Sequence, residues 1–202
     1  MPLFTPLTPR ALSAVVAERA ESLIGRACIA VSAPDAADPV EFAHRLVADL
    51  RLRGRATDVV ALHDFVRPAS VRLEHGRTDP DSYRHGWFDY DALDREVLRS
   101  LRERGRWLPR LWDEDTDRSA REHSREAADA QILVVAGPML LGRGLAFDLT
   151  IALTMSRGAL ERRTRPEDRW TVDPLLTHVC TDADVLVRYD HPDRPAVLQR
   201  WT

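Results

Sequence analysis

IAVSAPDAADPVEFAHRLVADLRLRG, residues 29–54, is the stretch from which the fold of this chain can be predicted. The run 27–32 that leads into it is almost entirely apolar and predicts a buried strand. From Pro39 to Leu52 apolar residues recur at helical spacing and predict an amphipathic helix, and Gly54 marks its end. A buried strand followed by such a helix is the repeating unit of a parallel sheet covered by helices.

The same alternation extends in both directions along the chain. Helices are predicted over 9–24, 91–104 and 155–164, and strands over 58–62, 131–136, 148–153, 184–189 and 196–200. Residues 67–89 are rich in Pro, Gly, Asp and aromatic side chains and predict a long structured loop. We therefore predict an α/β fold with three layers and a doubly wound, mostly parallel sheet. No linker divides the sequence, so residues 1–202 are expected to form a single domain, with an N-terminal helix in residues 1–25 and the α/β core in residues 26–202.

Composition limits the class of protein. The chain has 202 residues, of which 44% are hydrophobic and 30% charged, and this excludes a disordered, collagen-like or membrane-spanning chain. The formal net charge of −3 provides no general attraction to nucleic acid or to an anionic membrane. Cys28 and Cys180 form neither a disulfide framework nor a zinc motif, and residues 1–10 lack the pattern of a secretory signal. We expect a cytoplasmic protein without nucleic-acid or membrane partners.

All 29 basic residues are arginine, because the sequence contains no lysine. The protein therefore has no lysine for a Schiff base, for general base catalysis or for the phosphate loop of an ordinary P-loop enzyme. Pyridoxal-phosphate chemistry and ordinary Walker-A phosphate binding are both excluded by composition.

Five blocks of the sequence, in this order and spacing, resemble the bacterial uridine kinase-like branch of the P-loop nucleoside kinases. The resemblance extends from about Arg26 to Arg200 and implies the α/β fold of that family. The blocks are residues 29–54, VVALHDFVRP at 59–68, DPDSYRHGWFDYDAL at 79–93, ILVVAGPMLL at 132–141 and ADVLVRYDHPDRPAVL at 183–198.

The departures from the family pattern fall on its chemistry. A Walker-A loop needs glycines for a tight turn and bare amides, a lysine for the phosphates and a Ser or Thr for magnesium. The aligned positions here are Ala33, Asp38, Pro39 and Val40. His63 stands where the family carries its catalytic aspartate, with Asp64 beside it. Ala136 replaces an acidic residue, and the family's arginine-rich lid is shortened to a stretch around Arg162, Arg163, Arg165 and Arg169.

The altered loop has the pattern of a helix start. Asp38 is a strong N-cap, Pro39 suits the first helical position, and Glu41 lies three residues after the cap. Asp35, Asp38 and Glu41 also place negative charge where the resemblance puts the phosphates of ATP. We therefore predict a self-capped helix start that does not bind anions, a degenerate phosphate loop comprising Ala33, Asp35, Asp38, Pro39 and Val40.

Candidate site residues follow the strands, because ligands of such sheets bind at the carboxyl ends of the strands. His63 is a candidate acid/base or an anchor for a ligand, and the alternative is a histidine hydrogen-bonded to a neighbouring loop. Asp64 either orients His63 or stabilises a turn. We consider Arg67 and Arg110 as rim residues for an anionic group, although surface arginines are the more common outcome in this chain.

Aromatic and acidic residues supply the remaining candidates. An aromatic-rich loop, formed by Tyr83, His85, Trp87 and Phe88, either stacks on a flat ligand or packs on the core. The resemblance gives Asp89 a ligand contact, and the alternative is a helix N-cap. The acidic run 113–117 matches no calcium loop and is predicted to be solvated, and no metal site is expected.

Three functions remain open at this stage. The first is a non-catalytic kinase relative that keeps a pocket for a nucleoside-like or other small molecule and acts as a binding, regulatory or assembly component, for which a protein partner is one option. The second is a repurposed, ATP-independent enzyme of specialised metabolism with His63 as acid/base. The third is a nucleoside kinase with atypical ATP binding. No cofactor is expected for the first two, whereas the third requires ATP and magnesium.

Overall fold

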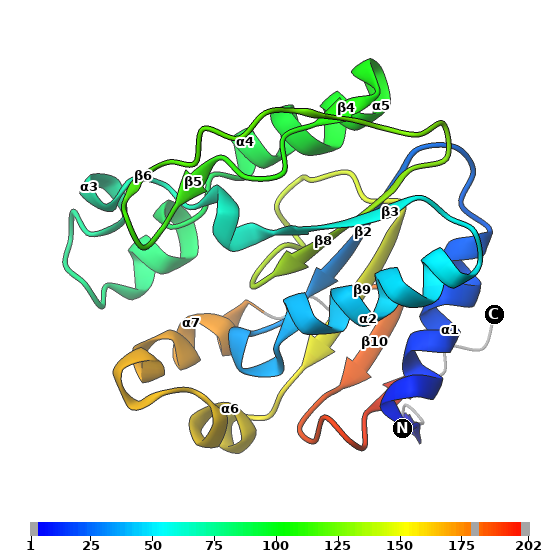
Figure 1. The fold of residues 1–202 in the computed structure, drawn as a ribbon. Coiled ribbons are helices and arrows are strands. Elements are labelled where there is room, and N and C mark those ends of the chain that lie inside the picture. Colours follow the sequence, from blue (N-terminus) through cyan, green and yellow to red (C-terminus); the bar gives the residue numbers. More distant parts are fainter. Residues whose placement is uncertain (1–3, 179–181, 199–202) are drawn as a thin grey trace.

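The computed structural model describes residues 4–178 and 182–198, and its centre is a seven-stranded sheet in the order β1-β11-β10-β9-β2-β8-β3 (Figure 1). Strands β10, β9, β2, β8 and β3 run parallel to one another. At the other edge of the sheet, β11 is antiparallel to β10 and β1 is antiparallel to β11. The doubly wound, mostly parallel sheet predicted from the sequence is confirmed. The strands are β1 (Phe4–Pro6), β2 (Ala27–Ser32), β3 (Thr57–Ala61), β8 (Ile132–Gly137), β9 (Leu149–Thr154), β10 (Val185–Arg188) and β11 (Ala196–Leu198).

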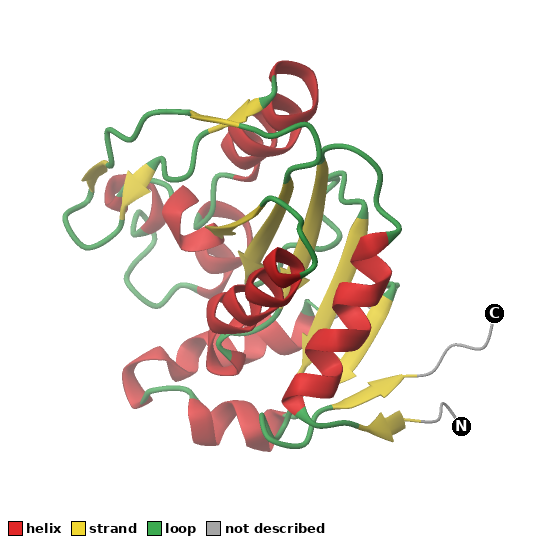
Figure 2. Ribbon diagram, turned by 45° about the vertical axis from the view of Figure 1, so that its right-hand side comes forward, coloured by secondary structure: helices red, strands yellow, loops and turns green. Residues whose placement is uncertain are grey.

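Helices cover both faces of the sheet (Figure 2). Helices α1 (Pro9–Glu21) and α2 (Pro39–Leu52) pack on one face, and α4 (Tyr90–Leu93) and α5 (Arg99–Arg104), joined by the π-helical turn Asp94–Leu98, pack on the other. Beyond the carboxyl ends of the strands lie α6 (Arg157–Arg163), the 3₁₀ segment Pro166–Thr171 and α7 (Val172–Thr177) (Figure 1). The remaining small elements are α3 (Ala69–Arg72), the 3₁₀ turns Asp35–Ala37 and Leu62–Phe65, the π-helical turn Ser82–Gly86, and the ribbons β4 (Arg106–Trp107) with β7 (Arg125–Glu126) and β5 (Trp112–Asp113) with β6 (Arg118–Ser119).

The apolar runs of the inner strands are explained by burial on both faces. In β8, Ile132 and Val134 face the core formed with α1 and α2, whereas Leu133 and Val135 face the core formed with α4 and α5. A strand covered on both sides has no solvent face and therefore no polar alternation. Cys28 in β2 is fully buried, as predicted, and burial raises the pKa of its thiol to about 12.

Local sequence signals predicted the bounds of some helices and strands to the residue and those of others only approximately. The strand 27–32 and the helix 39–52 are confirmed to the residue, whereas the helix predicted over 9–24 ends at Glu21 and that over 155–164 spans only 157–163. The predicted loop 67–89 is wrong in part, since α3 and the turn Ser82–Gly86 lie within it. Strand β1 was not predicted. Cys180 and residues 199–200 of the predicted last strand lie outside the described residues.

The carboxyl ends of β2 and β8 are tied together where the candidate site begins. Ala33 donates its amide hydrogen to the Gly137 carbonyl at 3.1 Å, and the Ser32 hydroxyl accepts the Leu140 amide hydrogen at 3.2 Å. A Cβ at Gly137 would lie 2.4 Å from the Cβ of Leu62, so only glycine allows the turn after β3 to approach this closely. Among the described helices, none is long and apolar enough to cross a membrane.

Candidate functional site

A cavity of about 560 Å³ opens beyond the carboxyl ends of the parallel strands. Its walls come from the loop after β2, the turn after β3, the turn Ser82–Gly86, the β5–β6 hairpin and the segment from α6 to α7. This volume lies within the range of about 300–1,000 Å³ typical of small-molecule sites. The lining residues on which the following paragraphs depend are Asp35, His63, Tyr83, Trp87, Glu114, Arg163, Asp168 and Trp170.

His63 joins two of these walls. It lies in the 3₁₀ turn after β3, where its Nδ1 is 2.9 Å from Glu114 Oε2 and its Nε2 is 3.1 Å from Asp35 Oδ1. Burial lowers the pKa of His63, but the charges and hydrogen bonds of Asp35 and Glu114 outweigh this and raise it to about 10. At neutral pH the ring is therefore an imidazolium that donates a hydrogen from each nitrogen to a carboxylate.

Arg72 fixes the position of Glu114 through an ion pair with its second carboxylate oxygen. The Arg72 side chain is 7% exposed, donates to Glu114 Oε1 at 2.8 Å and to the Arg67 carbonyl at 2.6 Å, and stacks its guanidinium 5.3 Å from the ring centre of Trp87. Burial raises the pKa of Glu114, but the hydrogen bond and charge of His63 and the charge of Arg72 leave it below its ordinary value. Glu114 is therefore a fixed carboxylate.

The acidic run 113–117 is not simply solvated, contrary to the prediction. In addition to the role of Glu114, Asp117 Oδ1 accepts hydrogens from the Ala69 amide at 2.8 Å and from Trp112 Nε1 at 3.0 Å. The Ala69 hydrogen bond in particular lowers the pKa of Asp117. These two carboxylates fasten the hairpin to α3, because each accepts a hydrogen from a neighbouring loop or helix.

Three aromatic rings form one wall of the cavity. Tyr83, Trp87 and Trp170 lie with ring centres 5.4–5.6 Å apart. Tyr83 is 3% exposed, and its hydroxyl is buried without a hydrogen-bond partner among the described residues. Burial keeps the Tyr83 pKa well above its ordinary value, so the phenol remains protonated and can donate or accept a hydrogen bond.

The loop after β2 closes on itself. Ala37 donates its amide hydrogen to the Pro34 carbonyl at 2.8 Å and Asp38 donates to the Asp35 carbonyl at 2.9 Å, and together they form a 3₁₀ turn. Asp38 has a left-handed backbone (φ 53°), and its Oδ1 accepts the Glu41 amide hydrogen at 3.4 Å. Such a conformation is tolerated by aspartate better than by most residues.

The predicted N-cap at Asp38 with Pro39 at the first helical position is thus confirmed. The reciprocal half of the predicted capping box is wrong, because the Glu41 side chain pairs with Arg45 and the Asp38 amide bonds to Asp35. Val40, in the first turn of α2, is half-buried and packs against the hydrophobic core that lies between the sheet and helices α1 and α2.

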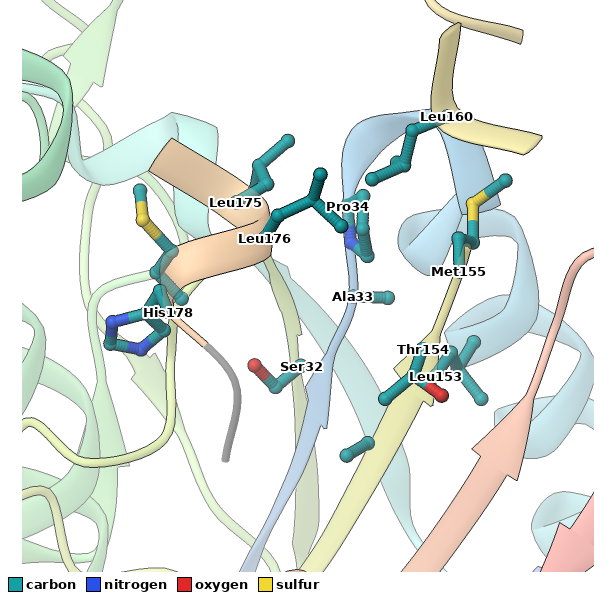
Figure 3. A pocket seen from close by; sticks show the side chains of 12 residues that line it. Ser32, Ala33, Pro34, Leu153, Thr154, Met155, Leu160, Leu175, Leu176 and His178 are labelled. Atoms are coloured by element: carbon teal, nitrogen blue, oxygen red, sulfur yellow. The ribbon is translucent and has the colours of Figure 1, made fainter. Parts of the chain in front are cut away.

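A second cavity, of about 70 Å³, lies beside this loop (Figure 3). Ser32, Ala33 and Pro34 line it from the end of β2, Thr154 and Met155 from the end of β9, and Leu175 and Leu176 from α7. It has room for a few water molecules, and its walls are largely apolar. Leu175 and Leu176 of α7 point toward Pro34 after β2 and form one side of this cavity (Figure 3).

Other sequence candidates lie away from the large cavity. Asp64 pairs with Arg110 at 2.9 Å instead of with His63, and Arg110 also pairs with Asp113. Asp89 caps α4 by accepting the Ala92 amide hydrogen at 2.9 Å. His85 is exposed, and neither it nor Arg67 is among the residues that line the cavity.

The sequence reasoning missed Glu114, Asp168 and Trp170 as site residues. Glu114 was assigned to a solvated loop, and Trp170 follows no recognisable motif. No local signal distinguishes Glu114 from the other acidic residues of the run 113–117, because its partner His63 lies 51 positions away. Among the described residues, no group of three or more His, Cys, Asp or Glu side chains is arranged so that it could hold a metal ion.

Comparisons with known proteins identify the fold. Neither a family model nor a curated protein matches this sequence. Among solved structures, a possible uridine kinase from Bacillus stearothermophilus matches with a TM-score of 0.66 at 19% identity, over 88% of this chain and 97% of that chain. A candidate fructose transport system kinase from Silicibacter sp. TM1040 matches with a TM-score of 0.70 at 20% identity, over 89% and 98%. The YGR205w protein matches with a TM-score of 0.51 at 13% identity, over 73% and 68%.

These identities are low, so the similarity shows the fold and leaves the activity to be argued from the site. The fold is the P-loop kinase-like α/β fold that the sequence resemblance implied.

Proposed function

We propose that this protein is a non-phosphorylating member of the P-loop kinase fold that binds a phosphate-free small molecule in the 560 Å³ cavity. The observation that carries this proposal is the bridge between His63 and Asp35, 3.1 Å long, across the space between the turn after β3 and the loop after β2. In an enzyme that transfers phosphate, this space has to admit the transferred group.

The residues beside the first loop do not fit the triphosphate of ATP. Pro34 and Pro39 have no amide hydrogen, and the amides of Ala37 and Asp38 are bonded to carbonyls of the loop itself. Asp35 and Asp38 add negative charge, and the cavity beside Ala33 and Pro34 of this loop has a volume of only about 70 Å³ and largely apolar walls. Phosphate binding needs free amides and positive charge, and this loop does not offer them to the phosphates of ATP or to the magnesium that accompanies them.

The large cavity, by contrast, has the properties of a ligand site. It combines an aromatic wall of Tyr83, Trp87 and Trp170 with charged groups held in fixed positions, and the buried Tyr83 hydroxyl has no hydrogen-bond partner among the described residues. A flat, nucleoside-like molecule without phosphate is the class of ligand that the aromatic wall would accommodate.

Two alternatives have weaker support. An enzyme that used His63 as general base would need a neutral ring, whereas Asp35 and Glu114 raise the His63 pKa to about 10 and engage both nitrogens. A kinase with atypical ATP binding would need an arginine at the first loop. Within residues 4–178 and 182–198, no arginine forms an ion pair or hydrogen bond with residues 33–38.

Calorimetric titration of the purified protein with magnesium–ATP, ADP, uridine and cytidine tests the proposal. We expect no heat of binding from either nucleotide, and binding of a nucleoside that is lost in Trp170→Ala. An Asp129→Asn variant is the matched control, since Asp129 is exposed and precedes β8 at the opposite end of the sheet. Saturable magnesium–ATP binding would overturn the proposal.

A further inference from the structure

The Tyr83 hydroxyl is a buried polar group without a hydrogen-bond partner among the described residues. The residue is 3% exposed, lines the cavity, and its hydroxyl finds no hydrogen-bond partner in the part of the chain that the structure describes. A buried hydroxyl in this state has lost its bonds to water without replacement. A ligand atom that hydrogen-bonds to Tyr83 would recover that loss, so this hydroxyl contributes to the choice of ligand.

The charges around Tyr83 are mainly negative. Asp35, Glu114 and Asp168 come from three separate segments, and the negative charge of each disfavours ionisation of the Tyr83 hydroxyl. Asp115 adds a fourth carboxylate to the cavity wall. A ligand with a negative group at this position would be repelled, whereas a positive group would be attracted.

The cations paired with these carboxylates balance their negative charge only in part. His63 is shared between Asp35 and Glu114, and Arg165 pairs with Asp168 at 2.7 Å. Arg163 lines the cavity and forms no ion pair among the described residues, but it is exposed, and its charge acts on the hydroxyl of Tyr189 after β10. The positive charge of Arg163 therefore belongs to the rim of the cavity, not to its Tyr83 end.

The aromatic wall is also suited to a cation. The faces of Trp and Tyr rings attract positive charge, and the Arg72 guanidinium already lies 5.3 Å from the centre of Trp87 on the protein side. Trp170 lies 5.4 Å from Tyr83 and is half-buried, so part of its surface is open to the cavity.

We propose that the ligand of this cavity is a flat organic cation, an amidinium or a protonated nitrogen heterocycle, which donates a hydrogen to Tyr83 Oη and packs its ring against Trp170. The proposal rests on the proposed function in requiring a small molecule in the same cavity, and it adds the charge class of that molecule.

Three planar probes of nearly equal size separate the possibilities: benzamidine is cationic, benzamide neutral and benzoate anionic. Each is titrated at neutral pH into the full-length protein, with tryptophan fluorescence and calorimetry as readouts. We expect benzamidine to bind about tenfold more tightly than benzamide, and benzoate not to bind. Tyr83→Phe and Asp168→Asn should each weaken benzamidine binding by roughly five- to tenfold.

Matched controls keep this result specific. Tyr90→Phe removes a hydroxyl that lies outside the cavity lining, and Asp129→Asn removes a carboxylate at the other end of the sheet, so neither should change the dissociation constant of benzamidine. Thermal melting of each variant verifies that it is folded.

The outcomes distinguish the inference from the proposed function. Equal or tighter binding of benzamide or benzoate overturns the cationic class and leaves a small-molecule site in place. No binding of any probe, or benzamidine binding that is unchanged in both Tyr83→Phe and Asp168→Asn, overturns the inference. The proposed function is judged separately, by magnesium–ATP titration.

Discussion

His63 and Asp35 are 28 positions apart in the sequence, yet His63 Nε2 lies 3.1 Å from Asp35 Oδ1 and joins the end of β3 to the loop after β2. Strand β8 lies between β2 and β3 in the sheet, so this ion pair crosses above the end of β8. Together with Glu114 on the other ring nitrogen, it makes the imidazolium a fixed cation that holds two loops in place.

The first prediction concerns the pH dependence of stability. The folded-state pKa of His63 is raised from 6.5 to about 10, so its stabilising contribution is fully present below about pH 6.5 and is lost as pH rises through 10. His63→Gln should lower the free energy of unfolding by about 1 kcal/mol near neutral pH, because the side chain is 38% exposed and solvent screens its pairs.

Urea unfolding of both proteins from pH 6 to pH 10.5 measures this difference. The two stability curves should converge at the alkaline end. A constant separation between them across the whole range would show that proton binding by His63 is not linked to folding.

The second prediction concerns the left-handed residue before α2. Asp38→Ala loses the N-cap and places a Cβ-bearing, non-polar residue at φ 53°, and it should cost about 1–2 kcal/mol. Asp38→Gly loses the cap but adopts this conformation freely, and it should cost less than the alanine variant. Chemical denaturation that ranked glycine as the more destabilising substitution would contradict the conformation found for Asp38.

The third prediction concerns the buried arginine. Arg72→Leu removes the cation paired with Asp117 and one of the two cations paired with Glu114, the other being His63, and should destabilise the protein by about 3 kcal/mol, because the arginine is buried. Arg72→Lys should recover little, because an ammonium cannot reproduce the forked contacts or the stacking on Trp87.

Arg165→Met is the matched comparison for this measurement. Arg165 also pairs with carboxylates but its side chain is 75% exposed, so its removal should cost less than about 1 kcal/mol in thermal or urea unfolding. Equal costs for the two positions would mean that burial does not set the strength of the Arg72 contacts.

The fourth prediction compares two tyrosine hydroxyls. Tyr83→Phe removes a buried hydroxyl that has no hydrogen-bond partner within residues 4–178 and 182–198, and it should leave the ligand-free protein equally or more stable. Tyr90→Phe removes a hydroxyl that donates to the Met139 carbonyl at 3.2 Å and should cost about 1 kcal/mol. Calorimetric melting of the two variants checks the order, and a larger loss for Tyr83→Phe would show that its hydroxyl is bonded in solution.

The strands and helices next to the site follow from local sequence. The apolar run 27–32, the Asp38–Pro39 cap and the spacing of apolar residues up to Leu52 predicted β2 and α2 to the residue, because each signal acts within a few positions. The same reasoning placed Asp35, His63, Tyr83 and Trp87 after or between predicted elements, and all four line the large cavity.

Tertiary structure decided what those residues do. Glu114 is 51 positions from His63, and Trp170 is 87 positions from Tyr83, and no periodicity or capping signal extends over such distances. The acidic run 113–117 had the composition of a solvated loop until the hairpin brought Glu114 between His63 and Arg72. Composition and local pattern predicted the sheet, and the absence of lysine from the sequence excludes the lysine of an ordinary Walker-A loop. The protonation state of His63 and the unpartnered hydroxyl of Tyr83 depend on burial and on charges from distant segments, which exist only once the chain has folded.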